Sequence, residues 1–85
     1  MSKIEERINE IQAVKTDSEN IVPELQQIEE EFGTMIENCE EMGATALAGR
    51  IQVAVDKLDD AKQELAEFIS TLEELITATQ AASED

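Results

Sequence analysis

The sequence predicts an all-α protein: an antiparallel two-helix hairpin that self-association or a partner completes into a helical bundle. Three observations lead to this prediction. Apolar residues recur every seven positions in both halves of the chain, which is the spacing of a helix with one apolar face. A glycine, Gly43, stands at the midpoint of the chain. The 85 residues include only 3 Gly and 1 Pro, too few for a turn-rich β fold.

The first half of the chain carries two apolar rows with a seven-residue period. One row consists of Ile4, Ile11, Ser18, Leu25, Phe32 and Cys39. The other begins three residues further on and consists of Arg7, Val14, Ile21, Ile28, Met35 and Met42. All but Ser18 and Arg7 are apolar, so we expect a helix over about residues 3–42.

The second half repeats the pattern in three rows. These rows are Ile51, Leu58, Leu65 and Leu72; Val55, Lys62, Ile69 and Ile76; and Leu47, Ala54, Ala61, Phe68 and Leu75. They predict a second helix over about 46–80, followed by a frayed tail at 81–85. The residues that we expect to be most buried are Leu25, Ile28, Phe32, Leu58, Leu65, Phe68 and Leu72.

The turn is expected at about 43–45. Gly43 suits the position just after a helix, where a left-handed conformation is needed. It is preceded by 42 residues and followed by 42, so the two helices match in length and residues 1–85 form a single domain. Gly49 falls early in the second helix, where we expect it to allow close approach of the helices.

Pro23 interrupts the first helical pattern. Proline has no N–H to donate and crowds the preceding turn, and the residues before it, Asp17-Ser18-Glu19-Asn20, favour caps over helix interiors. We therefore expect a kink or a break near residues 17–23. The seven-residue phase continues across it through Ile11, Ser18 and Leu25, which argues against a change of direction.

The apolar rows exceed what two helices hide from each other, because each helix covers only one side of its neighbour. We therefore expect a homodimer or a helical protein partner. The expected contacts lie beside the main rows: Ile8, Val22 and Ile36 on the first helix, and Leu47 and Leu75 on the second.

The residue inventory argues against an enzyme, and we expect no catalytic, cofactor-binding or metal-binding residue. There is no His and only one Cys, which excludes zinc sites and the Glu-x-x-His di-iron motif. Acid–base work needs a carboxylate with a shifted pKa in a pocket, whereas the paired carboxylates fall largely on polar helix faces. Cys39 lies in an apolar row and is expected to be a buried hydrophobic residue.

The charge is strongly acidic, with 21 Asp plus Glu against 6 Lys plus Arg and a net charge of −15. Such a surface repels nucleic acid and acidic membranes, and no apolar run is long enough to insert in a membrane. The N-terminal MSKIEERINE has no apolar core of a signal peptide. We expect a cytoplasmic location, or export without a cleavable signal peptide.

In its organisation the chain resembles the WXG, or ESAT-like, family of type VII secretion. The resemblance rests on a small acidic chain with two long helical segments and a glycine turn at mid-chain. Met42-Gly43-Ala44 stands where the family has Trp-x-Gly, keeping the Gly without the Trp. The family's Tyr-x-x-x-Asp/Glu export signal is represented only by the acidic end of Ala81-Ala82-Ser83-Glu84-Asp85, and Phe68 is followed by Leu72 where a Phe version needs an acid.

This resemblance implies a type VII secretion-associated substrate, or a targeting or chaperone factor that binds the helical N-terminal segment of a secreted toxin. Two other interpretations stay open. The net charge of −15 also suits an acidic phage-type inhibitor that imitates DNA. The long amphipathic helices also suit a chaperone or component of another secretion apparatus.

Overall fold

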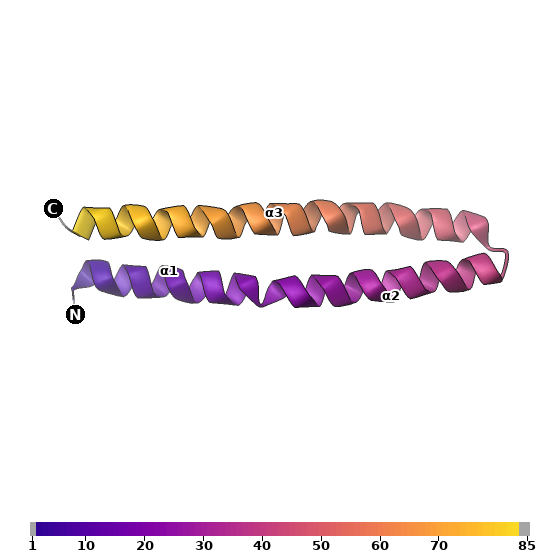
Figure 1. Ribbon diagram of the computed structural model, residues 1–85, viewed down its shortest axis with the longest axis horizontal. Coiled ribbons are helices and arrows are strands. Elements are labelled where there is room, and N and C mark those ends of the chain that lie inside the picture. The colour runs from indigo at the N-terminus through magenta and orange to yellow at the C-terminus, as the bar shows by residue number, and fades with distance from the viewer. Residues whose placement is uncertain (1, 84–85) are drawn as a thin grey trace. The chain divides into compact units, whose positions relative to one another are not determined.

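The computed structural model describes residues 2–83, and the protein is all-helical, as the sequence predicts. Helix α1 spans Lys3–Glu19, α2 spans Ile21–Glu41 and α3 spans Thr45–Ser83 (Figure 1). Within residues 2–83 there is no β-strand. Of the tail expected at 81–85, residues 81–83 belong to α3 and the last two lie outside the described residues.

The helices form two compact units. The first unit contains the chain up to Ile21 and the chain from Glu64 onward, so α1 pairs with the C-terminal half of α3. The second unit contains Val22–Gln63, in which α2 pairs with the N-terminal half of α3. An ion pair crosses between the helices in each unit: Lys15 with Glu73 at 3.5 Å in the first, and Lys62 with Glu29 at 3.2 Å in the second.

Helix α1 begins and ends at recognisable local signals. The Ser2 hydroxyl accepts a hydrogen bond from the Glu5 backbone N–H at 3.1 Å, which caps the first turn. Pro23 is the third residue of α2, in the first turn, where its missing N–H leaves no helical bond unmade. The break therefore falls at Asn20, which keeps right-handed helical dihedral angles of φ −68° and ψ −17°.

The turn after α2 is a Schellman motif. The Ala44 N–H donates to the Cys39 carbonyl at 2.8 Å and the Gly43 N–H donates to the Glu40 carbonyl at 3.1 Å. Gly43 has φ +77°, the left-handed conformation that disfavours any residue with a Cβ. Thr45 then begins α3 directly after this turn.

The least exposed side chains form a seam with alternating spacings of three and four residues. On the N-terminal side the seam consists of Ile8, Ile11, Lys15 and Ser18 in the first unit, and Leu25, Glu29, Phe32, Ile36 and Cys39 in the second. On α3 it consists of Ala48, Ile51, Val55, Leu58 and Lys62 in the second unit, and Leu65, Ile69, Leu72, Ile76 and Thr79 in the first. This is the a/d spacing of a coiled coil.

Two residues expected in the core are exposed. Ile28 is 39% exposed and Phe68 is 47% exposed, whereas Leu72 is only 7% exposed. The remaining expected core residues, Leu25, Phe32, Leu58 and Leu65, are half-buried. The prediction was wrong at Ile28 and Phe68 because each lies one residue before a seam position. A facing helix covers a strip two rows wide, and the third row falls outside it.

The two glycines around the turn should respond oppositely to alanine. Neither Cβ would meet an atom within 4 Å, so the effect is purely one of the backbone. Gly43→Ala forces a Cβ into a left-handed conformation and should lower the free energy of unfolding by about 1 to 2 kcal/mol. Gly49→Ala lowers the backbone entropy of the unfolded chain and should raise the free energy of unfolding by about 0.5 to 1 kcal/mol.

Urea denaturation followed by circular dichroism measures both variants. The open space beside Gly49 also corrects our expectation that it allows close approach of the helices, because no neighbouring atom stands near enough to need a glycine. If Gly49→Ala destabilised the protein, a contact at this position would have to exist after all.

A second pair of variants tests the burial pattern. Leu72→Ala removes a side chain that is 93% buried and should cost about 2 to 5 kcal/mol of unfolding free energy. Phe68→Ala, on the exposed row, should cost under about 1 kcal/mol despite the larger side chain. Equal losses for the two in urea denaturation would contradict the seam assignment.

Candidate binding surface

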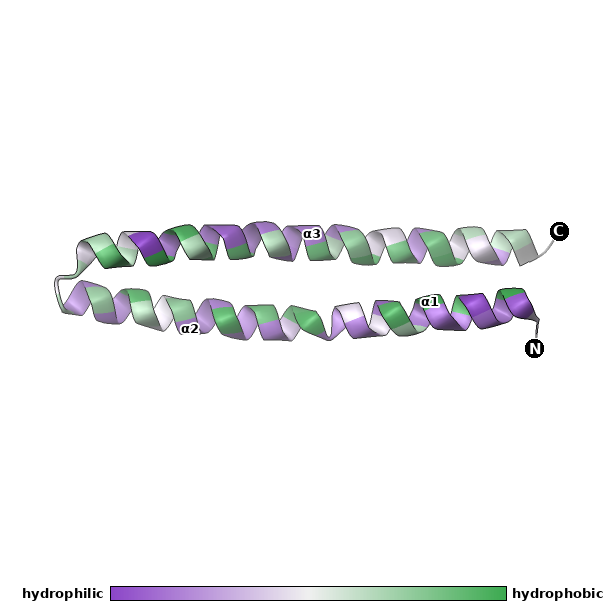
Figure 2. Ribbon diagram, turned by 180° about the vertical axis from the view of Figure 1, so that it is seen from behind, coloured by the Kyte–Doolittle hydropathy of each residue, from purple (hydrophilic) through white to green (hydrophobic). Residues whose placement is uncertain are grey.

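Each unit exposes an apolar flank beside its seam. The flank consists of residues one position before an a position, the g positions of the heptad. In the first unit it consists of Arg7, Val14 and Ile21 with Phe68 and Leu75, all exposed and all but Arg7 apolar. In the second unit it consists of Ile28, Met35 and Met42 with Leu47, Ala54 and Ala61, also all exposed. Figure 2 shows that apolar residues recur along the whole of each helix.

The opposite flank of each unit is polar, and grooves mark it. In the first unit a groove is lined by Gln12, Lys15, Thr16 and Glu19 from α1, and by Glu73 and Ile76 from α3. In the second unit a groove is lined by Ile36 and Glu40 from α2, and by Thr45, Ala48, Gly49 and Gln52 from α3. Because the two helices contribute their polar rows to the same side, their apolar rows share the other side.

The five predicted contact residues divide between seam and flank. Ile8 and Ile36 are half-buried in the seam, and Val22 continues the seam spacing with 36% of its surface exposed. Leu47 and Leu75 lie on the apolar flanks, about half exposed. Sequence reasoning grouped all five because all lie beside the main rows, and only the position of the facing helix separates them.

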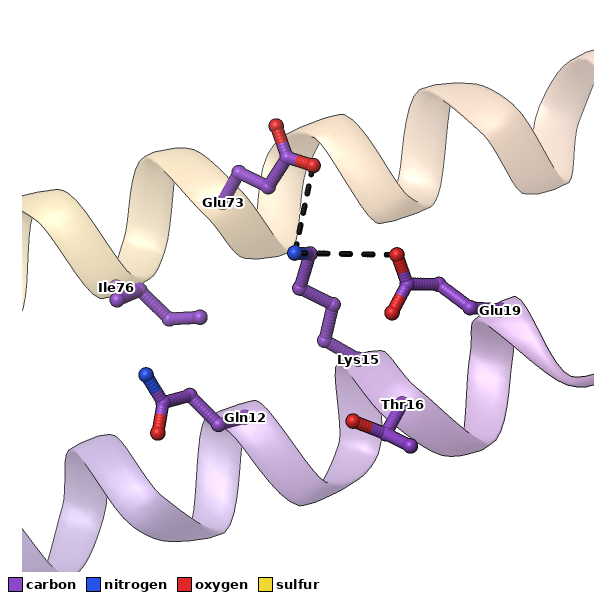
Figure 3. Close-up of a pocket in the computed structure, with 6 residues that line it drawn as sticks. All are labelled: Gln12, Lys15, Thr16, Glu19, Glu73 and Ile76. Carbon is purple, nitrogen blue, oxygen red and sulfur yellow. Dashed lines mark ion pairs between the residues drawn. The ribbon is translucent and has the colours of Figure 1, made fainter.

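Lys15 joins the two helices of the first unit from a seam position. Its Nζ lies 3.9 Å from Glu19 Oε2 on α1 and 3.5 Å from Glu73 Oε1 on α3. Figure 3 shows the Lys15 ammonium between the carboxylates of Glu19 and Glu73. The pairs are partly exposed, so they orient the helices more than they stabilise them.

A carboxyl pair and a lysine form the corresponding contact in the second unit. Lys62 Nζ donates to Glu29 Oε2 at 3.2 Å across the seam. A side-chain hydrogen bond between Asp59 and Glu29 raises the pKa of Asp59, because protonated Asp59 donates its proton to the Glu29 carboxylate. The same bond, together with Lys62, lowers the pKa of Glu29.

Beyond these contacts, the side chains on the described part of the chain form no further cluster of a recognisable site. No group of three or more Asp, Glu, Cys or His side chains among residues 2–83 is placed to hold a metal ion. Cys39 is a buried free thiol in the seam. Among the described residues, no helix combines the length and the apolar character of a membrane-spanning segment.

Comparison with known proteins returns no relative. No protein-family model matches the chain, and no curated protein or solved structure is significantly similar to it. The functional argument therefore depends on the residues and their placement. The feature that requires an explanation is the pair of exposed apolar flanks.

The carboxyl pair predicts a specific pH dependence. Ionised Asp59 is disfavoured in the folded chain because its pKa is raised. This cost is present above that raised pKa and disappears as the pH falls through it. Asp59→Asn keeps an N–H donor for Glu29 and cannot ionise. The variant should be more stable than the wild type at neutral pH, and the difference should shrink toward acid pH.

Glu29 acts with the opposite sign. Its pKa lies below the ordinary 4.5, so its contribution is present above that value and is lost as the pH falls through the lowered one. Urea midpoints in a series from neutral to acid pH separate the two groups. Asp60→Asn, next to Asp59 and outside the pair, controls for the loss of one negative charge. Equal gains for both variants at every pH would contradict the shared proton.

Proposed function

We propose that the protein is a non-enzymatic binding protein that works by helix packing. In this proposal its helices form an antiparallel hairpin, and the apolar flanks dock on a helical partner or a second copy to complete a bundle. The partner of this kind that fits best is the helical N-terminal segment of a secreted protein. The protein then acts as a type VII secretion-associated substrate, or as a targeting or chaperone factor.

One observation carries the proposal: in each unit both helices present their exposed apolar rows on the same side. Val14 and Ile21 share this side with Phe68 and Leu75 in the first unit, and these four are between 41% and 47% exposed. A single helix laid along such a flank covers g-position residues of both helices at once. Contiguous exposed apolar surface of this kind is typical of protein–protein contacts.

The secretion role has separate support. The chain is short and acidic, its helices are long, and Gly43 in the turn matches the glycine of the family's Trp-x-Gly. The absence of Trp and Tyr from the sequence favours a helper that binds a secreted protein over a substrate with its own export signal.

The proposal is tested with the tagged full-length chain and its native host. Phe68→Glu with Leu75→Glu places two charges on the apolar flank of the first unit. Ala66→Glu with Thr77→Glu adds the same charge to exposed positions of α3 off that flank. The wild type and the control pair should bind a helical secreted protein. The flank variant should lose this binding while its circular dichroism spectrum remains that of a helical protein.

Salt distinguishes this proposal from the acidic-inhibitor alternative. Packing of apolar flanks over an interface of about 1,200 Å² or more should persist at high salt. Binding of an acidic surface to a nucleic-acid channel should weaken steeply as salt is raised. Retained binding by the flank variant, or a steep salt dependence, would contradict the packing proposal.

A further inference from the structure

The apolar flank of the second unit has a different charge on each of its two rims. On α2 the rim row at the heptad c positions consists of Glu24, Glu31 and Asn38. On α3 the same row consists of Arg50 and Lys57 and continues just beyond the unit to Glu64. In both rows the two charges are seven residues apart, about 10.5 Å along a helix. Within residues 2–83 neither Arg50 nor Lys57 makes an ion pair, and Glu31 makes none.

The side chains between the rims also differ in size. The α2 row of this flank carries the large residues Ile28 and Met35, and the facing stretch of the α3 row carries Ala54 and Ala61. Large side chains pack best into the space above small ones. Over this stretch the α2 half is large with an acidic rim, and the α3 half is small with a basic rim, so the two halves are complementary here. Nearer the turn, Met42 and Leu47 are both large.

From these observations we infer that the second unit binds a second copy of the chain, flank to flank, with α2 of one protomer on α3 of the other. The inference rests on the proposed function, because it takes the apolar flank as the binding surface. A two-fold axis parallel to the helices produces this contact twice, and it places both turns at the same end of the dimer. Met35 then packs on the partner's Ala54, and Ile28 on the partner's Ala61.

The position of each residue along the helix axis determines which charges meet across the dimer. The seam positions of α2 and α3 lie at equal distances from the turn: Cys39 and Ala48 are both 7% exposed, and the next positions are Ile36 with Ile51. Counting outward in the same way puts Lys57 at the level of Glu30 and Glu31. Of these two, Glu31 lies on the rim of the flank, so it pairs with the partner's Lys57.

The alternative symmetric contacts fail on the same observations. A two-fold axis across the helices lays α2 on α2, which brings Glu24 and Glu31 against the partner's acidic row. Like charges in contact disfavour that arrangement, which has no opposite-charge pair to offset them, whereas the α2-on-α3 contact sets the pair of Glu31 with the partner's Lys57 against one approach of Glu24 to the partner's Glu64. Ile28 and Met35 would also meet large side chains. The contact of α3 on α3 brings Arg50 and Lys57 against their own copies and leaves Ala54 and Ala61 facing alanines across a gap.

Charge reversal tests the arrangement with the full-length chain alone. Lys57→Glu or Glu31→Lys turns both rim pairs of the homodimer into like-charge contacts. Each variant should self-associate about tenfold more weakly than the wild type, by sedimentation equilibrium at about 0.1 M salt, where contacting charges are not screened. An equimolar mixture of the two variants restores both pairs and should form a heterodimer, and K57E and E31K in one chain should restore the homodimer.

Glu30→Lys is the matched control. It makes the same charge change one residue away, at the b position on the other side of α2, so its mixture with K57E should not recover. Circular dichroism checks that every variant stays helical. A gain in association for E31K alone would indicate α2 on α2 and overturn the arrangement, as would failure of the K57E and E31K mixture to recover.

A wild type that stays monomeric also overturns the inference. Its failure is distinguishable from failure of the proposed function, which is tested on the flank of the first unit. A monomer that still binds its secreted partner through Phe68 and Leu75 refutes the dimer only. A monomer that binds no helical partner refutes both.

Discussion

The structure depends on one constraint: a helix covers only a strip two rows wide on the helix beside it. In both units that strip is the seam, with its three- and four-residue spacing from Ile8 to Cys39 and from Ala48 to Thr79. Any apolar residue outside the strip stays in contact with water. The exposed flanks and the shallow core both follow from this geometry.

The seam is a shallow core with several polar members. No side chain among residues 2–82 is fully buried, and Lys15, Ser18, Glu29 and Lys62 occupy seam positions that are usually apolar. Polar seam residues cost stability and select one register, because a shift of the helices separates their partners. Lys15 and Lys62 have partners across their units, and Ser18 donates to the Val14 carbonyl at 2.8 Å. These residues therefore specify the register of the helices more than they add to stability.

The charged residues that border the apolar flanks differ between the two units. Glu24 and Glu31 border the apolar flank of the second unit on α2, while Arg50 and Lys57 border it on α3. The flank of the first unit is bordered on α1 by Lys3, Glu10 and Asp17 and has no cation on its α3 rim. Two flanks of similar apolar character thus differ in rim charge, and that difference is the basis for assigning them different partners.

Much of the fold follows from the sequence because its signals are local. The seven-residue period determines the helices, Pro23 determines the break, and Gly43 determines the turn through a conformation that other residues avoid. Which apolar row faces the neighbouring helix is determined by tertiary packing. The rows of Leu25 and Ile28 have the same period and similar composition, and both predict a helix equally well. Only packing of α3 against α1 and α2 places Leu25 in the seam and leaves Ile28 and Phe68 on the flank, because one helix presents a single two-row strip to its neighbour.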